Sequence, residues 1–401
     1  MIRKATISLC LVPMLLVAAC DGGGSGPVSP PSPPPADYNY SPPVDSGDGW
    51  TIGSAGANEL DVSILESMMD DIRSGQFEFI DSVAIARNGV LVFDETIRQS
   101  TDREDSLVAN TDLSIHREFS VSKSITSLIV GIAIDEGYIS GTDVRFLDLF
   151  PHPSYLNWDD RKNDITLADV LAMRAGLEWD EWNPPYTDPN NQLINFYDTH
   201  VDYAKGLLDL PLAADPGSIF AYNTIASITL GQAVENAVPL SLADYAMSEL
   251  FSPLGITDLE ILTTPTGLPN GGAGLYFRTR DIVKFGQLAI DGGLWNGDRI
   301  VSEAWINESM TPRSDLVFTN PAEWDWELEG YGYQWWTGFY DHNGQQFDIR
   351  IAWGYGGQWI IAIPSADLVV AVNSHGYLGE DGASNQAHAL VQQYILEALT
   401  N

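Results

Sequence analysis

The sequence predicts an α+β protein in which strands from both ends of the folded region form one antiparallel sheet around a mostly helical middle. Two observations support this fold class. Strand-like runs occur early, at residues 82–86 and 90–93, and again late, at residues 331–339, 346–353, 358–363 and 368–373. Between them, about residues 120–255, helical patterns and loops dominate. The expected architecture is therefore a sheet flanked by helices, with a helical subdomain inserted at about 120–255.

Individual elements follow from local signals. Residues 63–75 have a helical pattern, and Asn88-Gly89 between two short apolar runs is a strong hairpin signal. Further helices are expected at 166–173, ahead of Gly176, and at 225–237. Asn343-Gly344 marks a second turn between strands, and residues 386–399 close the chain as a helix.

Composition limits the kinds of function. The 401-residue chain has 55 acidic and 19 basic residues, a net charge of −36, and 44% hydrophobic residues. This charge argues against nucleic-acid partners and against a basic membrane-binding face. It favours a soluble surface, and a saline habitat is an alternative explanation.

The N-terminus is typical of a targeting segment. Arg3 and Lys4 precede a short apolar stretch at residues 7–17, which is too short to span a bilayer. The stretch ends in Val17-Ala18-Ala19-Cys20, which resembles a bacterial lipobox with Cys20 as the lipidated residue. A plain secretory signal is the alternative. We expect a signal peptide at 1–19, a Gly/Ser/Pro-rich tether at 20–58 and one folded domain at 59–401, facing the periplasm or the exterior on a membrane anchor.

The tetrad Ser120-Val121-Ser122-Lys123 carries the chemistry. Positions i and i+3 share a helix face, so a lysine amine can reach a serine hydroxyl and activate it as a nucleophile. The tetrad by itself is also common on helix surfaces. Here an apolar stripe follows it, which predicts a buried helix whose N-terminus favours developing negative charge (the stripe is Ile125, Leu128, Ile129, Ile132 and Ala133).

Other chemistries lack support in the sequence. The only cysteines are Cys10 and Cys20, so the mature domain has neither a disulfide nor a zinc-thiolate site. The histidines are scattered, and neither a phosphate-binding glycine loop nor a Gly-x-Ser-x-Gly elbow is present. We expect no metal and no organic cofactor.

With these motifs in hand, residues 80–375 resemble the penicillin-recognising serine hydrolases, in the class C β-lactamase-like branch. The segment 171–177 resembles a second family segment, and 216–224 resembles the family's Pro-Gly…Tyr segment. The resemblance implies a β-lactamase/DD-peptidase-like fold, with Tyr222 sharing the serine proton with Lys123. Many members have Tyr-x-Asn, whereas this chain has Asn223 and Thr224, a form similar to 6-aminohexanoate-dimer hydrolases and family VIII esterases.

The third family element corresponds to residues 352–358. The resemblance implies an oxyanion hole formed by the backbone N–H groups of Ser120 and Tyr355, beside Gly354, with Gly356 as an alternative donor. Members that degrade β-lactams usually have a basic side chain where this sequence has Ala352. Arg350 lies two residues earlier, on the same strand face, and is a possible substitute for substrate binding together with Thr224.

The resulting interpretation is a lipid-anchored, extracytoplasmic serine hydrolase that cleaves small esters, amides or short peptides through an acyl-serine. A β-lactamase or D-alanyl-D-alanine carboxypeptidase is the alternative within the enzyme class. From another class, the alternative is a non-catalytic cell-wall-binding lipoprotein that keeps the fold.

Overall fold

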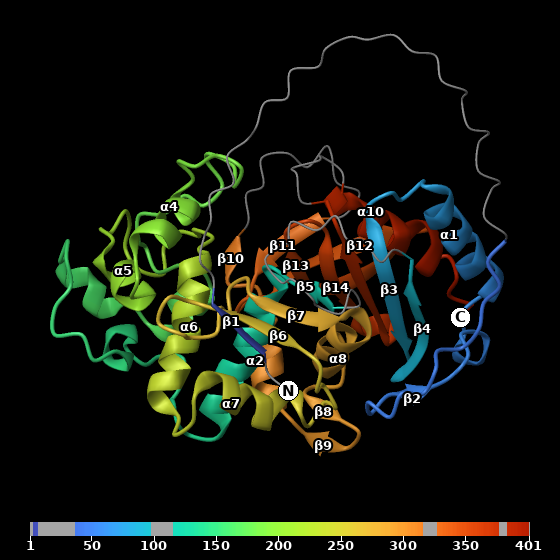
Figure 1. Cartoon of the computed structure of the whole chain (residues 1–401), viewed down its shortest axis with the longest axis horizontal. Coiled ribbons are helices and arrows are strands. Elements are labelled where there is room, and N and C mark those ends of the chain that lie inside the picture. The colour runs from blue at the N-terminus through green and yellow to red at the C-terminus, as the bar shows by residue number, and fades with distance from the viewer. Residues whose placement is uncertain (1–2, 7–36, 98–114, 316–326, 377–382, 401) are drawn as a thin grey trace, which may run out of the picture.

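A nine-stranded sheet forms the centre of the protein. The computed structural model describes residues 3–6, 37–97, 115–315, 327–376 and 383–400. The strand order is β10-β11-β12-β13-β14-β15-β3-β4-β2, and the neighbours are antiparallel except for the β2–β4 pair (Figure 1). The strands are β2 (Thr51–Ile52), β3 (Ile80–Arg87), β4 (Val90–Thr96), β10 (Ser314–Asp315), β11 (Glu327–Tyr331), β12 (Trp336–His342), β13 (Gln345–Gly354), β14 (Gln358–Ile363) and β15 (Leu368–Ser374).

Early and late strands meet in the middle of this sheet, which confirms the predicted α+β fold class. β15 pairs with β3 in antiparallel register, with Val370 opposite Ile85. Both predicted Asn-Gly turns are present: Asn88 and Gly89 have φ of 54° and 71°, and Asn343 and Gly344 have φ of 54° and 77°. Two successive positive φ angles are what a tight type I′ hairpin requires.

Helices cover both faces of the sheet. Adjacent residues of a strand point to opposite faces, and β14 shows the two sides. Ile360 contacts α8 (Thr279–Ile290) near Gly286, while the Trp359 ring lies 4.3 Å from that of His388 on α10 (Ala383–Leu390). α2 (Val121–Asp135) also contacts β13 and β14, and α1 (Val62–Ser74) contacts the turn of π-helix, residues 391–395, that follows α10.

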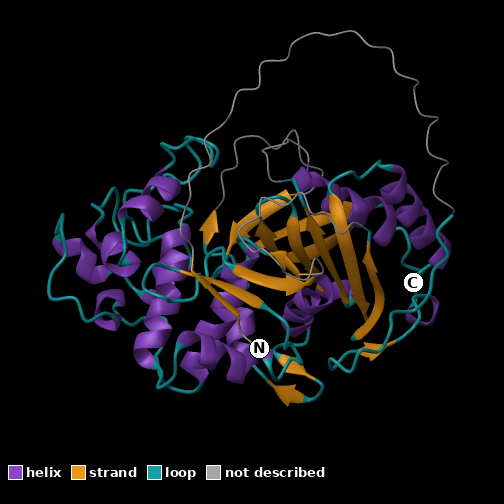
Figure 2. Ribbon diagram, in the orientation of Figure 1, coloured by secondary structure: helices purple, strands orange, loops and turns teal. Residues whose placement is uncertain are grey.

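The inserted region is mainly helical and lies beside the sheet (Figure 2). Its helix α6 packs against α2 and so joins this region to the rest of the protein. The helices are α3 (Leu167–Leu171), α4 (Gln192–Thr199), α5 (Tyr203–Asp209), α6 (Thr224–Ala237) and α7 (Leu242–Ala246). After α8 come β8 (Leu294–Trp295), β9 (Asp298–Arg299) and α9 (Glu303–Ser309).

A second, four-stranded sheet was not predicted from the sequence. Its order is β1-β6-β7-β5, from β1 (Arg3–Thr6), β5 (Ile115–Arg117), β6 (Glu260–Thr263) and β7 (Leu275–Arg278). β5 is only three residues long, too short for an alternating pattern to stand out. It matters because it leads directly into the Ser120 tetrad. β1 lies within the predicted signal segment; Cys20 and residues 7–36 lie outside the described part of the chain.

The structure corrects two element boundaries. Residues 331–339 are not one strand: Tyr331 ends β11, Trp336 begins β12, and Gln334 between them has φ of 66°. Residues 37–58, predicted as tether, pack on the domain from Tyr38 onward. The Tyr38 hydroxyl donates to Glu95 at 2.6 Å, and the indole of Trp50 donates to the Arg280 carbonyl at 3.0 Å. Three aromatic residues within Gly- and Pro-rich sequence, Tyr38, Tyr40 and Trp50, provide this anchoring.

No helix in the described ranges is long and apolar enough to cross a membrane.

Trp50→Ala tests whether residues 37–58 belong to the folded unit. Trp50 is 6% exposed and packs edge-on against Trp295 at 4.8 Å. Because truncating a buried aromatic side chain leaves a cavity, we expect the free energy of unfolding to fall by about 3–5 kcal/mol in urea denaturation. Trp158→Ala is the control, since Trp158 is 50% exposed and should lose less than about 1 kcal/mol. Equal, small losses would mean that Trp50 does not belong to the folded core.

Candidate active site

Ser120 lies at the N-terminus of α2, at the edge of a large cavity. It is the N-cap residue, yet its hydroxyl makes no capping hydrogen bond, which leaves the hydroxyl for other contacts. Nearly every residue of α2 is buried, as the apolar stripe predicted. The preceding residue, Phe119, has φ of 44°, a strained backbone conformation for a bulky residue. Ser120 lines a cavity of about 580 Å³.

Lys123 is the buried partner of Ser120. Its side chain is 1% exposed, and its Nζ lies 3.0 Å from Ser120 Oγ, 2.9 Å from Thr224 Oγ1 and 2.8 Å from the Gly272 carbonyl oxygen. Burial disfavours the charged amine and lowers the pKa of Lys123 to about 8, while the negative charge of Glu181 acts in the opposite direction. A substantial fraction of Lys123 is therefore neutral near pH 8.

The hydrogen bonds around Lys123 fix the direction of its lone pair. The Thr224 hydroxyl donates its proton to Glu181 Oε1, so towards Lys123 it acts only as an acceptor, and the Gly272 carbonyl can only accept. A neutral amine has two N–H groups and one lone pair. The two N–H groups are taken by Thr224 and Gly272, and the lone pair is left facing the Ser120 hydroxyl.

Glu181 was not identified from the sequence. It is 2% exposed, and its carboxylate accepts hydrogen bonds from Trp179 Nε1 at 3.1 Å, Tyr186 Oη at 2.9 Å, and both the backbone N and the hydroxyl of Thr224. These four bonds satisfy the carboxylate and fix the Thr224 hydroxyl. The only sequence signal was an acidic residue between two tryptophans, 179 and 182.

Tyr222 also reaches the reactive pair. Its ring centroid is 4.9 Å from Lys123 Nζ, and its phenol interacts electrostatically with the Ser120 side chain. Burial, and then the charge of Glu181, raise the pKa of Tyr222, while the Ser120 side chain acts against them, so the phenol is neutral near pH 8. Its neighbour Asn223 caps α6 by accepting from the Ala226 N–H at 2.9 Å. This explains why Thr224, rather than an asparagine side chain, meets Lys123.

The end of β13 lies against the segment that carries Ser120. A Cβ on Gly354 would come within 2.3 Å of the Glu118 carbonyl oxygen, so only glycine permits this approach. The next residue, Tyr355, lines the cavity with Ser120, and its ring lies 5.6 Å from that of Phe119. Gly356 follows with φ of 80°. Ser120 and Tyr355 thus line one cavity, and their role as oxyanion donors stays a prediction.

Arg350 is not brought to this cavity. It lies within β13, opposite Thr337 and Ala362, and its Nη1 donates to the Ile349 carbonyl. The described lining instead contains Arg117, which no sequence motif had indicated.

Of the aromatic side chains near the motifs, Tyr186 lines the cavity, whereas Trp335 and Trp359 are core residues with 0% exposure.

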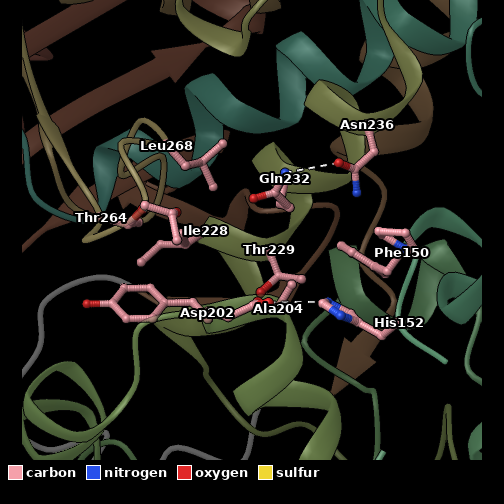
Figure 3. Close-up of a pocket in the computed structure, with 13 residues that line it drawn as sticks. Phe150, His152, Asp202, Ala204, Ile228, Thr229, Gln232, Asn236, Thr264 and Leu268 are labelled. Carbon is pink, nitrogen blue, oxygen red and sulfur yellow. Dashed lines mark hydrogen bonds and ion pairs between the residues drawn. The ribbon is translucent and has the colours of Figure 1, made fainter. Parts of the chain in front are cut away.

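A second cavity, of about 160 Å³, lies against α6 and shares Tyr203 and Thr264 with the first (Figure 3). His152 and Asp202 face each other at 3.6 Å with Thr229 beside them, while Gln232 donates to Asn236 at 3.1 Å. No residue of the Ser120 tetrad lines this cavity. Within the described ranges, no cluster of three or more His, Cys, Asp or Glu residues could hold a metal ion.

A buried Ser–Lys–Tyr cluster at a helix N-terminus, beside a sheet strand, defines a serine hydrolase of the β-lactamase type. The Beta-lactamase family matches residues 78–394, and the chain belongs to this family.

Individual relatives agree with this assignment. The 6-aminohexanoate-dimer hydrolase of Paenarthrobacter ureafaciens is 25% identical over 233 residues, 55% of this chain and 57% of that protein, so the match spans little more than half of the relative. A family VIII carboxylesterase structure has a TM-score of 0.59 at 17% identity, covering 82% of this chain and 95% of the other. The octameric penicillin-binding protein homologue from Pyrococcus abyssi has a TM-score of 0.59 at 19% identity, covering 83% and 77%.

Proposed function

We propose that the protein cleaves esters or short amides through an acyl-serine intermediate. The observation that carries this proposal is the hydrogen-bond pattern of Lys123, which leaves the lone pair of a neutral amine directed at Ser120. The Ser120 oxygen attacks the substrate carbonyl carbon as its proton passes to Lys123. The C–O or C–N bond to the leaving group then breaks, and the leaving group takes up a proton. Water attacks the acyl-serine, and the acid product leaves.

Tyr222 and two backbone groups complete this mechanism. Tyr222, whose ring lies beside Lys123, relays the proton between the attacking oxygen and the leaving group. The N–H groups of Ser120 and Tyr355 stabilise the oxyanion, and the helix N-terminus adds a favourable dipole. Residues of this chain supply every one of these roles, and the mechanism requires no cofactor.

Esters and short amides are favoured over β-lactams as substrates. Ala352 is 0% exposed and offers no charge for the carboxylate of a β-lactam. The relative named for 6-aminohexanoate-dimer hydrolysis and the carboxylesterase neighbour point to the same class. A β-lactamase or D-alanyl-D-alanine carboxypeptidase is the second candidate. A non-catalytic cell-wall-binding lipoprotein is disfavoured by the intact Ser120, Lys123 and Tyr222.

Substitution of the Ser–Lys pair tests the mechanism. Ser120→Ala should abolish covalent labelling by a fluorophosphonate and lower kcat/KM for p-nitrophenyl butyrate by at least about 10³-fold. Lys123→Ala should lose nearly as much, and the double variant little more than Ser120→Ala, because the groups act as one unit. Folding of each variant is checked by circular dichroism. A folded Ser120→Ala protein with more than about a tenth of the wild-type rate would exclude Ser120 as nucleophile. Nitrocefin, assayed in parallel, should be the poorer substrate.

The pH profile tests the role of Lys123 as base. Only the neutral amine accepts a proton, so kcat/KM should rise with pH below the Lys123 pKa and level off above about pH 8. Glu181→Gln removes the negative charge that favours protonated Lys123, so the pKa of Lys123 should fall. The acidic limb of the kcat/KM profile should then move to lower pH. Asp198→Asn is the matched control, since Asp198 lines the cavity but does not contact Thr224. If the acidic limb of the Glu181→Gln profile stays at the wild-type pH or moves to higher pH, Lys123 is not the base.

We also propose that the enzyme is attached to a bacterial membrane through lipidated Cys20 and faces the periplasm or exterior. The motif Val17-Ala18-Ala19-Cys20 after a basic and apolar leader supports this location. Cys20→Ser should move the protein from the membrane fraction to the soluble fraction, or stop signal cleavage. Cys10→Ser is the control, because Cys10 lies in the leader and should change neither. Membrane partition and processing that are unaffected by Cys20→Ser would refute lipidation.

A further inference from the structure

The active-site cavity has a charge pattern that the mechanism does not use. Among the described residues that line it, Arg117 is the one basic side chain, and Glu181 and Asp198 are the acidic ones. Arg117 ends β5, three residues before Ser120. Lys123 lies below the surface and is not part of the lining.

Two contacts hold Arg117 in place, but the terminal nitrogens of its guanidinium, Nη1 and Nη2, take no part in them. Its Nε donates to the Ala273 carbonyl at 2.9 Å, and its guanidinium carbon lies 4.3 Å from the centroid of the Phe119 ring. Neither Nη1 nor Nη2 bonds to any residue that the structure describes. The contacts fix the direction of the guanidinium and leave the four N–H donors of Nη1 and Nη2 for another molecule.

The chain has 55 acidic residues against 19 basic ones, yet not every described arginine meets a carboxylate: Arg174, Arg299 and Arg350 bond to backbone carbonyl oxygens. Other arginines pair with nearby aspartates: Arg161 with Asp159 and Asp215, Arg278 with Asp258, and Arg280 with Asp48 and Asp94. The Arg117 guanidinium has no carboxylate partner among the described residues, although it lies in a cavity with two acidic side chains.

A second group in the same cavity also lacks a partner. The buried Tyr197 hydroxyl has no hydrogen-bond partner of normal length among the described residues, although the Asn270 side chain lies beside it. Burial, and then the charge of Glu181, raise the pKa of Tyr197, while the positive charge of Arg117 acts against them. Tyr197 and Arg117 both line the cavity. An unpaired buried hydroxyl is costly, and a bound acceptor relieves it.

We propose that Arg117 and Tyr197 form a carboxylate-binding subsite, which makes the enzyme selective for esters or amides that carry a carboxylate away from the cleaved bond. One N–H group of Nη1 and one of Nη2 bind the two carboxylate oxygens in parallel, and the Tyr197 hydroxyl donates to one of these oxygens. A monoanion fits because Glu181 and Asp198 repel a more highly charged group. The proposal rests on the proposed hydrolase function and adds a substrate class to it.

Two matched esters test the subsite: p-nitrophenyl hydrogen adipate, with a free carboxylate, and p-nitrophenyl hexanoate, which is neutral. After subtraction of spontaneous hydrolysis, the wild-type protein should prefer the adipate ester by at least tenfold in kcat/KM. In Arg117→Gln the ratio of the two kcat/KM values should fall to near one. Arg117→Lys, which keeps the charge but loses the fork, should give an intermediate ratio. Tyr197→Phe should reduce the ratio by a smaller factor.

Arg350→Gln separates the two candidate arginines, because Arg350 lies outside the cavity and its loss should leave the ratio unchanged. The subsite is refuted if folded Arg117→Gln keeps the wild-type ratio, if Arg350→Gln removes the preference instead, or if the wild-type protein hydrolyses both esters equally well. Failure of the hydrolase function itself looks different: neither ester is cleaved, and Ser120 takes no fluorophosphonate label.

Discussion

The buried amine of Lys123 joins three parts of the chain at one point. Its hydrogen-bond partners come from the start of α2, the start of α6 and the loop before β7, through Ser120, Thr224 and Gly272. A polar group this deeply buried has to satisfy its hydrogen bonds inside the protein. Each of the three segments must therefore be correctly placed for the others to be stable, and the chemistry occupies the same point.

Buried polar side chains connect the sheet to this point. Gln334, in the turn between β11 and β12, accepts from Ser227 of α6 at 2.6 Å and donates to the Leu171 carbonyl at 2.6 Å, while its own carbonyl accepts from Ser124 of α2. On the other side, Asn373 of β15 bonds to both Glu118 and Gln358. The helical region and the sheet are thus held in register around Ser120, as positioning of reacting groups requires.

Some of the site could be predicted because its signals are local. Ser120 and Lys123 are one helical turn apart, so helix geometry alone brings them together. Glu181 and Arg117 could not be found this way, because they reach the cavity from a loop and a three-residue strand that only tertiary packing places. Arg350 was selected by strand alternation, which gives the face but not the position along the strand. It precedes Gly354 by four residues, about 13 Å at the rise of a strand.

The fold class was more predictable, since strand patterns at both ends and Asn-Gly turns are strong signals. The anchoring of residues 37–58 depends on single aromatic residues that the surrounding Gly and Pro residues obscure.

The pairing of β15 with β3 has a consequence for how the protein matures. The two strands lie at opposite ends of the folded region, and Asn373, which bonds to Glu118 beside the nucleophile, is on the later one. Contacts between segments so distant in sequence form late, because a long loop must close first. During synthesis the tetrad is made early, yet its surroundings are complete only after the C-terminal strands emerge. In a partly synthesised chain Ser120 is therefore unreactive. The serine becomes reactive only when the C-terminal strands have completed the sheet.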